Sequence, residues 1–257
     1  MPLTAAQICA KAANIARVPG FLVQAGDYLN VVLAELAQNY DMMLIKQTYN
    51  FNFAPSQINY LGQAFQNYPA NYLRSINRES FYVIQGVPYP MIHVDQNEFD
   101  MLVQQAGISN YPVFFTVDMS LTGASNSLVA GTPGLLNVPI ALFWQVPSGA
   151  YPVTQRYYSQ PADIATPSTS SQVPWFPNQN YLITRVAGEL MKDADDERAP
   201  SFLSANEDMY PMGAGVLLRH YLQMEGDKGD RVQTVTLDRR RFGYRYDNLK
   251  QTKVLGW

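Results

Sequence analysis

Charge is spread very unevenly along this chain, and this distribution limits what the chain can fold into. Residues 1–188 carry 16 of the Asp, Glu, Lys and Arg side chains, whereas residues 189–257 carry 23. No charged residue occurs between Asp118 and Arg156. Glycines and prolines cut this uncharged interval into short pieces, which favours brief strands and turns over one long apolar helix. The interval is therefore predicted to belong to a sheet, and no membrane-spanning helix is expected.

Composition narrows the classes of protein further. The 257 residues, 47% of them hydrophobic, allow one large domain or two small ones. Charged residues make up only 15%, against about 25% in a typical soluble domain. Cys9 is the only cysteine, so a disulfide framework and CxxC sites are excluded. A net charge of −3 argues against a chain that binds nucleic acid over its whole surface.

Apolar residues at helical spacing predict helices near both ends of the chain. The first spans residues 4–17, with Thr4 as its cap. The second spans residues 27–47, with Asp27 as its cap and an apolar stripe of Leu29, Leu33, Leu36, Tyr40 and Met43. Later helices are predicted at residues 179–193 and 204–224, and a short one at 95–104. At the start of the helix predicted at 204–224, Ser204 and Glu207 have the spacing of a capping box.

The middle of the chain has the pattern of strands. TYNFNFAP, residues 48–55, alternates aromatic and polar side chains as a half-buried strand does. Short apolar runs separated by turn residues follow at 81–84, 89–94, 113–117, 135–143 and 153–158. The sequence therefore predicts an all-β insert of about six strands over residues 51–158.

The last segment is basic and aromatic. Residues 231–257 hold seven Lys or Arg and two Asp, a net charge of +5, after a hydrophilic, glycine-bearing break at 225–230. The segment is too short to build its own core, and fully extended it reaches about 90 Å. Its aromatic and β-branched residues predict an arm that becomes ordered when it binds a partner. Arg and aromatic side chains suit nucleic acid and protein interfaces alike, and the acidity of the whole chain favours a protein.

Metal binding and catalysis find little support. An EF-hand loop counted from Asp193 would need Gly at its sixth position and Glu at its twelfth, where the sequence has Arg198 and Ser204. The cluster Asp193, Asp195, Asp196 and Glu197 is therefore interpreted as a solvated helix end. Nucleophile elbows and phosphate-binding loops are missing from the sequence. We expect no metal, no cofactor and no catalytic residue.

The histidines and the cysteine have plain structural interpretations. His93 is predicted to be a packed or half-exposed strand residue. His220 lies on the apolar side of its predicted helix and is interpreted as a core histidine. Cys9 is predicted to be a small buried residue in an Ala-rich helix.

The order of these elements resembles that of the head-to-tail adaptor (connector) proteins of short-tailed bacteriophages. The resemblance rests on two N-terminal helices that lead into YNFNF (49–53), an inserted sheet, and helices that return after it. It also rests on YPVTQRYYSQPADI (151–164), on WFPN (175–178) at the entry to a helix, and on TLDRRRF (236–242) in the final segment. None of these is a catalytic motif.

The resemblance implies a fold. It is of the α+β class: a helical bundle from the N- and C-terminal helices, with an inserted antiparallel β domain and an extended C-terminal arm. The implied divisions are N-terminal bundle helices (1–48), β domain (49–160), linker and C-terminal bundle helices (161–230) and arm (231–257).

The resemblance also implies a function, that of a structural virion protein and not an enzyme. Such adaptors form a twelve-fold ring at the head–tail junction of the virion, after synthesis in the host cytoplasm. The ring binds the portal protein on one face and the next tail protein, a nozzle or tube, on the other. DNA passes through its channel without specific binding, and no membrane is involved. The arm residues expected to bind the portal are Val232, Val235, Leu237, Arg239, Arg240, Arg241, Phe242, Tyr244, Tyr246 and Trp257.

Two other functions remain open at this point. The Tyr-rich insert could bind a glycan or a host receptor through flat aromatic faces beside Asn and Gln. Alternatively, two carboxylates in a cleft of the insert could serve a virion-associated cell-wall hydrolase.

Overall fold

The computed structural model describes residues 2–53, 64–103, 111–118, 139–208 and 210–233, with the backbone alone for Asn77, Arg78 and residues 226–233. The chain divides into two compact units. We call residues 1–29, 167–171 and 177–257 the helical unit, and residues 30–166 and 172–176 the sheet unit. The division falls within a single helix, α2.

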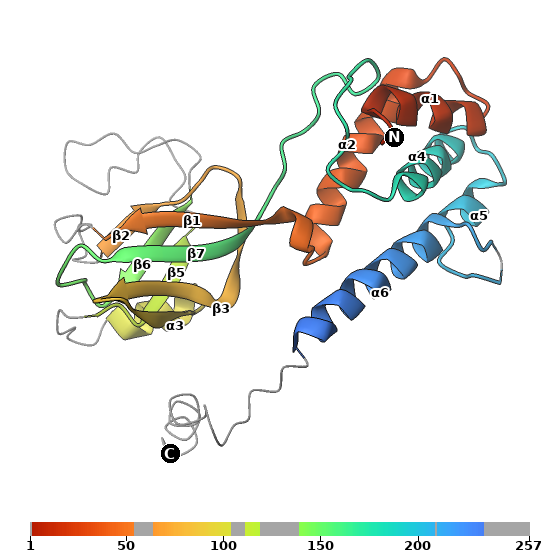
Figure 1. The fold of residues 1–257 in the computed structure, drawn as a ribbon. Helices are drawn as coiled ribbons and strands as arrows, with labels where there is room; N and C mark the ends of the chain where they lie inside the picture. Colours follow the sequence, from red (N-terminus) through yellow and green to blue (C-terminus); the bar gives the residue numbers. More distant parts are fainter. Residues whose placement is uncertain (1, 54–63, 104–110, 119–138, 209, 234–257) are drawn as a thin grey trace. The chain divides into compact units, whose positions relative to one another are not determined.

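The helical unit is organised around α4. It contains α1 (Ala5–Ile15), the first part of α2 (Leu22–Asn39), α4 (Gln179–Asp193), α5 (Ala199–Leu203) and α6 (Ala214–Gln233). Within this unit α4 packs against α1, α5 and α6 (Figure 1). Its buried stripe includes the predicted Leu182, Val186 and Leu190. The bounds predicted for α4 are confirmed.

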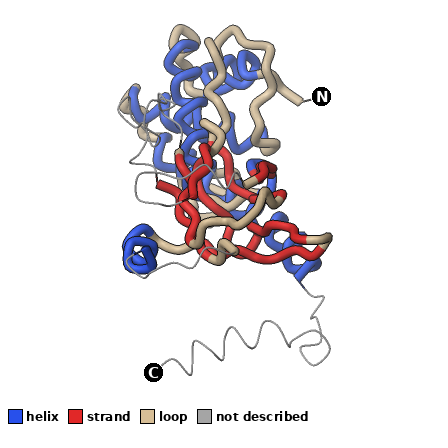
Figure 2. Tube along the Cα trace, turned by 90° about the vertical axis from the view of Figure 1, so that its left-hand side faces the viewer, coloured by secondary structure: helices blue, strands red, loops and turns tan. Residues whose placement is uncertain are grey.

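The sheet unit holds seven strands among the described residues. Their order is β1-β7-β3-β4-β5-β6-β2, and every neighbouring pair is antiparallel except β4 and β5 (Figure 2, strands in red). The short helix α3 (Gln96–Val103) links that parallel pair. A 3-10 turn, η1 (Met43–Ile45), precedes the first strand. The strands are β1 (Lys46–Asn52), β2 (Ala64–Asn67), β3 (Tyr72–Ile84), β4 (Val87–His93), β5 (Phe114–Asp118), β6 (Ile140–Trp144) and β7 (Pro152–Ser159).

The sheet curls, and each of its faces has a core. Tyr49 on one edge strand donates to the carbonyl oxygen of Asn67 on the other edge at 3.0 Å, so the two edges approach each other. Side chains alternate between faces along β6, because successive Cβ atoms of a strand point to opposite sides. Phe143 joins the inner cluster with Phe53 and Phe115. Leu142 joins a second cluster with Phe99 of α3.

Many tyrosines pack inside the curled sheet. Tyr68, Tyr72, Tyr82 and Tyr157 are each at most 7% exposed. Three of these hydroxyls have polar partners there: Tyr68 donates to the Oε1 atom of Gln155, Tyr157 donates to Gln47 and Asn71, and Tyr72 shares a hydrogen bond of 2.7 Å with Ser75. Buried tyrosine hydroxyls need such partners. Part of the Tyr content of this chain therefore belongs to its core.

The predicted fold class is wrong. In place of a helical bundle with an inserted antiparallel β domain, the chain is a mixed α and β protein dominated by the curled sheet, which includes a parallel pair. The main cause lies in α2. Asn30 exchanges two hydrogen bonds of 3.1 Å with the backbone of Ile164, so the second half of α2 is tied to the segment after β7 within the sheet unit.

Several predicted helix bounds need correction. Thr4 caps α1 through a reciprocal capping box with Gln7, as expected of a cap. By contrast, α2 begins at Leu22, so Asp27 lies inside it and is no cap, and α2 ends at Asn39 because η1 and β1 follow. The helix predicted at 204–224 begins only at Ala214, as α6, and a separate short helix, α5, ends at Leu203 before the predicted span starts. The hydroxyl of Ser204 accepts from the backbone N–H of Asn206, a turn that replaces the expected capping box.

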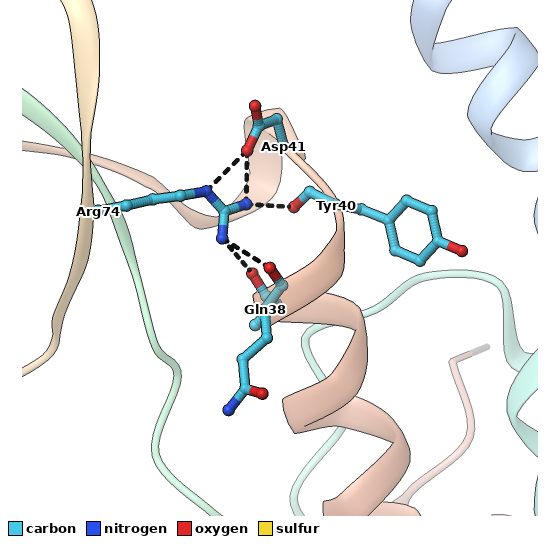
Figure 3. Close-up of polar contacts among 5 residues, drawn as sticks. Gln38, Tyr40, Asp41 and Arg74 are labelled. Atoms are coloured by element: carbon cyan, nitrogen blue, oxygen red, sulfur yellow. Dashed lines mark hydrogen bonds and ion pairs between the residues drawn. The ribbon is translucent and has the colours of Figure 1, made fainter.

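Arg74 connects β3 to the end of α2 within the sheet unit (Figure 3). Its guanidinium donates to the carbonyl oxygens of Ala37 (3.2 Å), Gln38 (2.9 Å) and Tyr40 (2.9 Å), and its Nε donates to Asp41 at 2.8 Å. It also lies 4.9 Å above the ring of Tyr158. The last carbonyl oxygens of a helix lack donors within the helix. At the end of α2, the Arg74 guanidinium is that donor.

His93 gives the sheet unit an expected pH dependence. As predicted, it is a half-buried strand residue, with its ring 5.2 Å from that of Phe115. Burial lowers the pKa of His93 below its usual 6.5, an effect that Asp95 partly offsets. His93 therefore binds a proton more readily in the unfolded chain than in the folded one. As the pH falls below about 6.5, this difference lowers the free energy of unfolding. We expect the melting temperature to fall between pH 7.5 and 5.5, and to fall less in His93→Gln. Equal slopes in thermal unfolding of the two proteins would contradict this.

Candidate interaction site

The start of α6 is fixed by unusually close backbone packing. The N–H of Gly215 donates to the carbonyl oxygen of Ser204 at 3.1 Å, and that of Leu217 donates to Gly213 at 3.0 Å. A Cβ on Gly215 would lie 2.7 Å from the Cα of Ala205, and one on Gly213 would lie 2.5 Å from the Ser204 carbonyl oxygen. Only glycine permits these approaches. They set the direction in which α6 runs from the turn that precedes it within the helical unit.

Beyond its first turn, α6 buries little of its apolar side. Ala214 and Val216 are buried at its start. From there to Glu225, a row of apolar side chains is half-buried or exposed, with Met224 58% exposed. We call these residues the α6 stripe: Leu217, Leu218, Tyr221, Leu222 and Met224. The apolar stripe of an amphipathic helix normally faces the core of the protein. Because this stripe is only partly buried, it is a candidate interaction surface.

The surroundings of the stripe are acidic. Glu207 and Asp208 are exposed in the turn before α6, and Glu225 lies on α6 itself. His220 lies 4.0 Å from Glu207, and Arg219 donates to the carbonyl oxygen of Ala205 at 2.6 Å. Over residues 204–225, three acidic residues and one arginine give a net charge of −2.

The predicted arm begins as helix. The break predicted at residues 225–230 is wrong, because α6 continues without interruption to Gln233. The two glycines of the predicted break, Gly226 and Gly229, therefore lie inside α6, where each costs about 1 kcal/mol relative to alanine. Val232 therefore lies on α6. The other predicted portal-binding residues lie outside the described part of the chain: Val235, Leu237, Arg239, Arg240, Arg241, Phe242, Tyr244, Tyr246 and Trp257.

The acidic cluster after α4 has local partners. Arg198 makes several hydrogen bonds to Asp196, and they lower the pKa of that carboxyl to about 2. Tyr28 donates to Asp193, which raises the pKa of the Tyr28 hydroxyl to about 12. Within the described ranges, no three His, Cys, Asp or Glu side chains gather closely enough to hold a metal ion.

The predictions for the remaining candidate residues, Cys9 and His220, have different outcomes. Cys9 is buried, as predicted, and burial raises the pKa of its thiol to about 11. The prediction of a core His220 is wrong, because its side chain is 51% exposed. The face of α6 interpreted from the sequence as core-facing is buried only at its start, and its later residues are half-buried or exposed. An apolar stripe looks the same in sequence whether its cover comes from the same chain or from another, so periodicity alone missed this surface.

Comparisons with known proteins add no family. Neither a scan against protein-family models nor a search of curated proteins finds a match to this chain. Among the helices of the described residues, none is long and apolar enough to cross a membrane.

Proposed function

We propose that this chain is a structural virion protein: a head-to-tail adaptor that forms a ring between the portal and the tail and extends the DNA exit channel. The observation that supports this most is the α6 stripe, a half-buried to exposed apolar row on a helix that leads into the basic, aromatic C-terminal segment. Exposed apolar surfaces of this kind mark interaction sites, and the partner we propose is a protein.

The mechanism we propose is binding without turnover. Arg239, Arg240 and Arg241 make charge-assisted hydrogen bonds to carboxylates or carbonyls of the portal. Phe242, Tyr244 and the other aromatic residues of the arm fill apolar pockets, as aromatic anchors of protein interfaces do. The arm carries +5 on a chain of −3, so the rest of the chain carries −8. A channel of that sign repels DNA phosphates and lets the genome slide without specific contacts.

The proposal extends to the partners and the place of assembly. The ring consists of copies of this chain, twelve in the adaptors that it resembles. Its second face receives the next tail protein. The protein is made in the host cytoplasm and ends at the head–tail junction of the virion.

Deletion of residues 234–257 tests the role of the arm. The cut follows the last residue of α6, so the truncated chain retains every described element and is expected to melt at the same temperature as the full chain. We expect it to lose binding to purified portal rings of the same virus, measured by co-sedimentation.

A point variant separates the arm's basic run from its length. Arg239→Ala with Arg240→Ala and Arg241→Ala is expected to weaken portal binding, whereas Lys250→Ala with Lys253→Ala serves as the control for loss of charge outside that run. Unchanged binding by the truncated chain would refute the proposed role of the arm.

A further inference from the structure

A strained residue lies where the chain passes from the sheet unit to the helical unit after β7. Thr166 has a φ of 44°, in the left-handed region. A β-branched residue rarely adopts this conformation, and a residue that precedes a proline, here Pro167, normally favours extended backbone. Strain of this kind persists only where surrounding contacts hold it in place. Contacts on both sides of Thr166 supply that hold.

Two contacts fasten this part of the chain to one face of α2. We call residues 164–170 the strap, and they lie in the loop between β7 and α4 (Figure 1). Asn30 exchanges two hydrogen bonds with the backbone of Ile164, whose side chain is 3% exposed. One turn earlier in α2, a Cβ on Gly26 would lie 3.2 Å from the Cβ of Pro167, so the absence of a side chain lets the strap lie this close. Residues four apart share a face of a helix, so both contacts lie along the same side of α2.

A third contact fastens the strap to the start of α1. The backbone N–H of Ala6 donates to the carbonyl oxygen of Ser170 at 3.2 Å. This N–H is one of the first four of α1, which have no acceptor within the helix. The strap is therefore held by Ile164 within the sheet unit and by Pro167 and Ser170 within the helical unit. Thr166 lies between these two sets of contacts.

We infer that the strap is a strained fastening that opens as one piece, and that Thr166 is the residue that favours opening. The closed strap keeps Thr166 in the left-handed region, and opening lets its backbone become extended, so strain offsets part of the free energy of the three contacts. Such a segment opens at a lower free energy than the buried helices beside it. Opening turns a fastened connection between the two units into a slack one, and each unit can then adjust separately to a partner. The inference concerns the free chain and does not depend on the adaptor function.

Amide hydrogen exchange of the full chain, resolved by residue with NMR, tests the strain. The Ile164 N–H, which donates to the side chain of Asn30, reports on opening of the strap, and the Val186 N–H, in the buried middle of α4, reports on unfolding of the helical unit. Asparagine adopts the left-handed region more readily than threonine, so we expect Thr166→Asn to slow exchange at Ile164 by about fivefold and to leave Val186 unchanged. Thr169→Asn makes the same replacement within the strap, at a residue outside the left-handed region, and should leave both rates unchanged.

Asn30→Ala tests whether the strap opens as one piece. The variant removes a contact of the sheet unit, and the Ala6 N–H, which bonds Ser170, reports from the helical unit. We expect exchange at both Ile164 and Ala6 to quicken by about fivefold, the range expected from lost hydrogen bonds. Asn39→Ala makes the same replacement at an exposed position of α2 and should leave both rates unchanged.

Three outcomes would overturn the inference. The first is exchange at Ile164 that is equal or faster in Thr166→Asn, because Thr166 would then not favour opening. The second is faster exchange in Asn30→Ala at Ile164 alone, which would show that the contacts open separately. The third is exchange at Ala6 that quickens only in proportion to exchange at Val186, because the strap would then open only when the helical unit unfolds.

Discussion

Replacement of Gly215 with alanine is expected to lower the free energy of unfolding by about 3 kcal/mol, the upper end of what overpacking costs. The new Cβ would lie 2.7 Å from both the Cα and the Cβ of Ala205 and 3.0 Å from its backbone nitrogen. Backbone atoms cannot move aside as the end of a flexible side chain can, so α6 has to shift as a whole. Urea unfolding of the full chain, followed by far-ultraviolet circular dichroism, measures the effect.

The sign of this effect is diagnostic. In a helix without such a contact, Gly→Ala stabilises by about 1 kcal/mol, because alanine has the higher helix propensity. Gly20→Ala, in the turn before α2, is the control for loss of a glycine without a close contact: nothing lies within 4 Å of the Cβ it would add, so we expect a small stabilisation of about 0.4–1 kcal/mol through the unfolded chain. Gly188→Ala provides an intermediate case, because its new Cβ meets the side chain of Leu203, which can rotate. A stable Gly215→Ala protein would mean that α6 does not start against Ala205.

The local features of this fold that were predictable are those that neighbouring residues determine. The capping box of Thr4, the bounds of α4 and the short helix α3 follow from signals a few residues long. Most strands also follow from alternation. β2 was missed because Ala64–Asn67 is short and its burial comes from pairing with β6, far along the chain.

The features that failed depend on contacts between distant residues. The sequence around Asn30 does not reveal that its amide will bind the backbone of Ile164, and this contact assigns half of α2 to the sheet unit. The bundle predicted from the helices therefore does not form. Likewise, the periodicity of α6 predicts an apolar side without revealing what covers it. Of the predicted site, Val232 alone lies in the described part of the chain.

Arg74→Ala is expected to destabilise the sheet unit by about 2–3 kcal/mol, in line with the loss of several hydrogen bonds to partly buried carbonyls. The carbonyls of Ala37 and Tyr40 lose their donor, and Asp41 loses its ion pair. The guanidinium charge at the carboxyl end of α2, where the helix dipole favours a cation, is lost as well. Thermal unfolding of the full chain reports the change.

Arg74→Lys shows which property of Arg74 matters. Lysine retains the charge but cannot direct a planar set of donors at three carbonyls and a carboxylate together, so we expect it to restore less than half of the loss. Arg156→Ala is the control: that arginine is half-exposed and 3.3 Å from Glu79, and a surface pair of this kind contributes about 0–1 kcal/mol. Full restoration by lysine would mean that Arg74 acts as a point charge at the helix end. The expectation would be wrong if Arg74→Ala had no larger effect than Arg156→Ala. Water would then replace the guanidinium at these carbonyls without cost. The contact between α2 and β3 would depend on apolar packing instead.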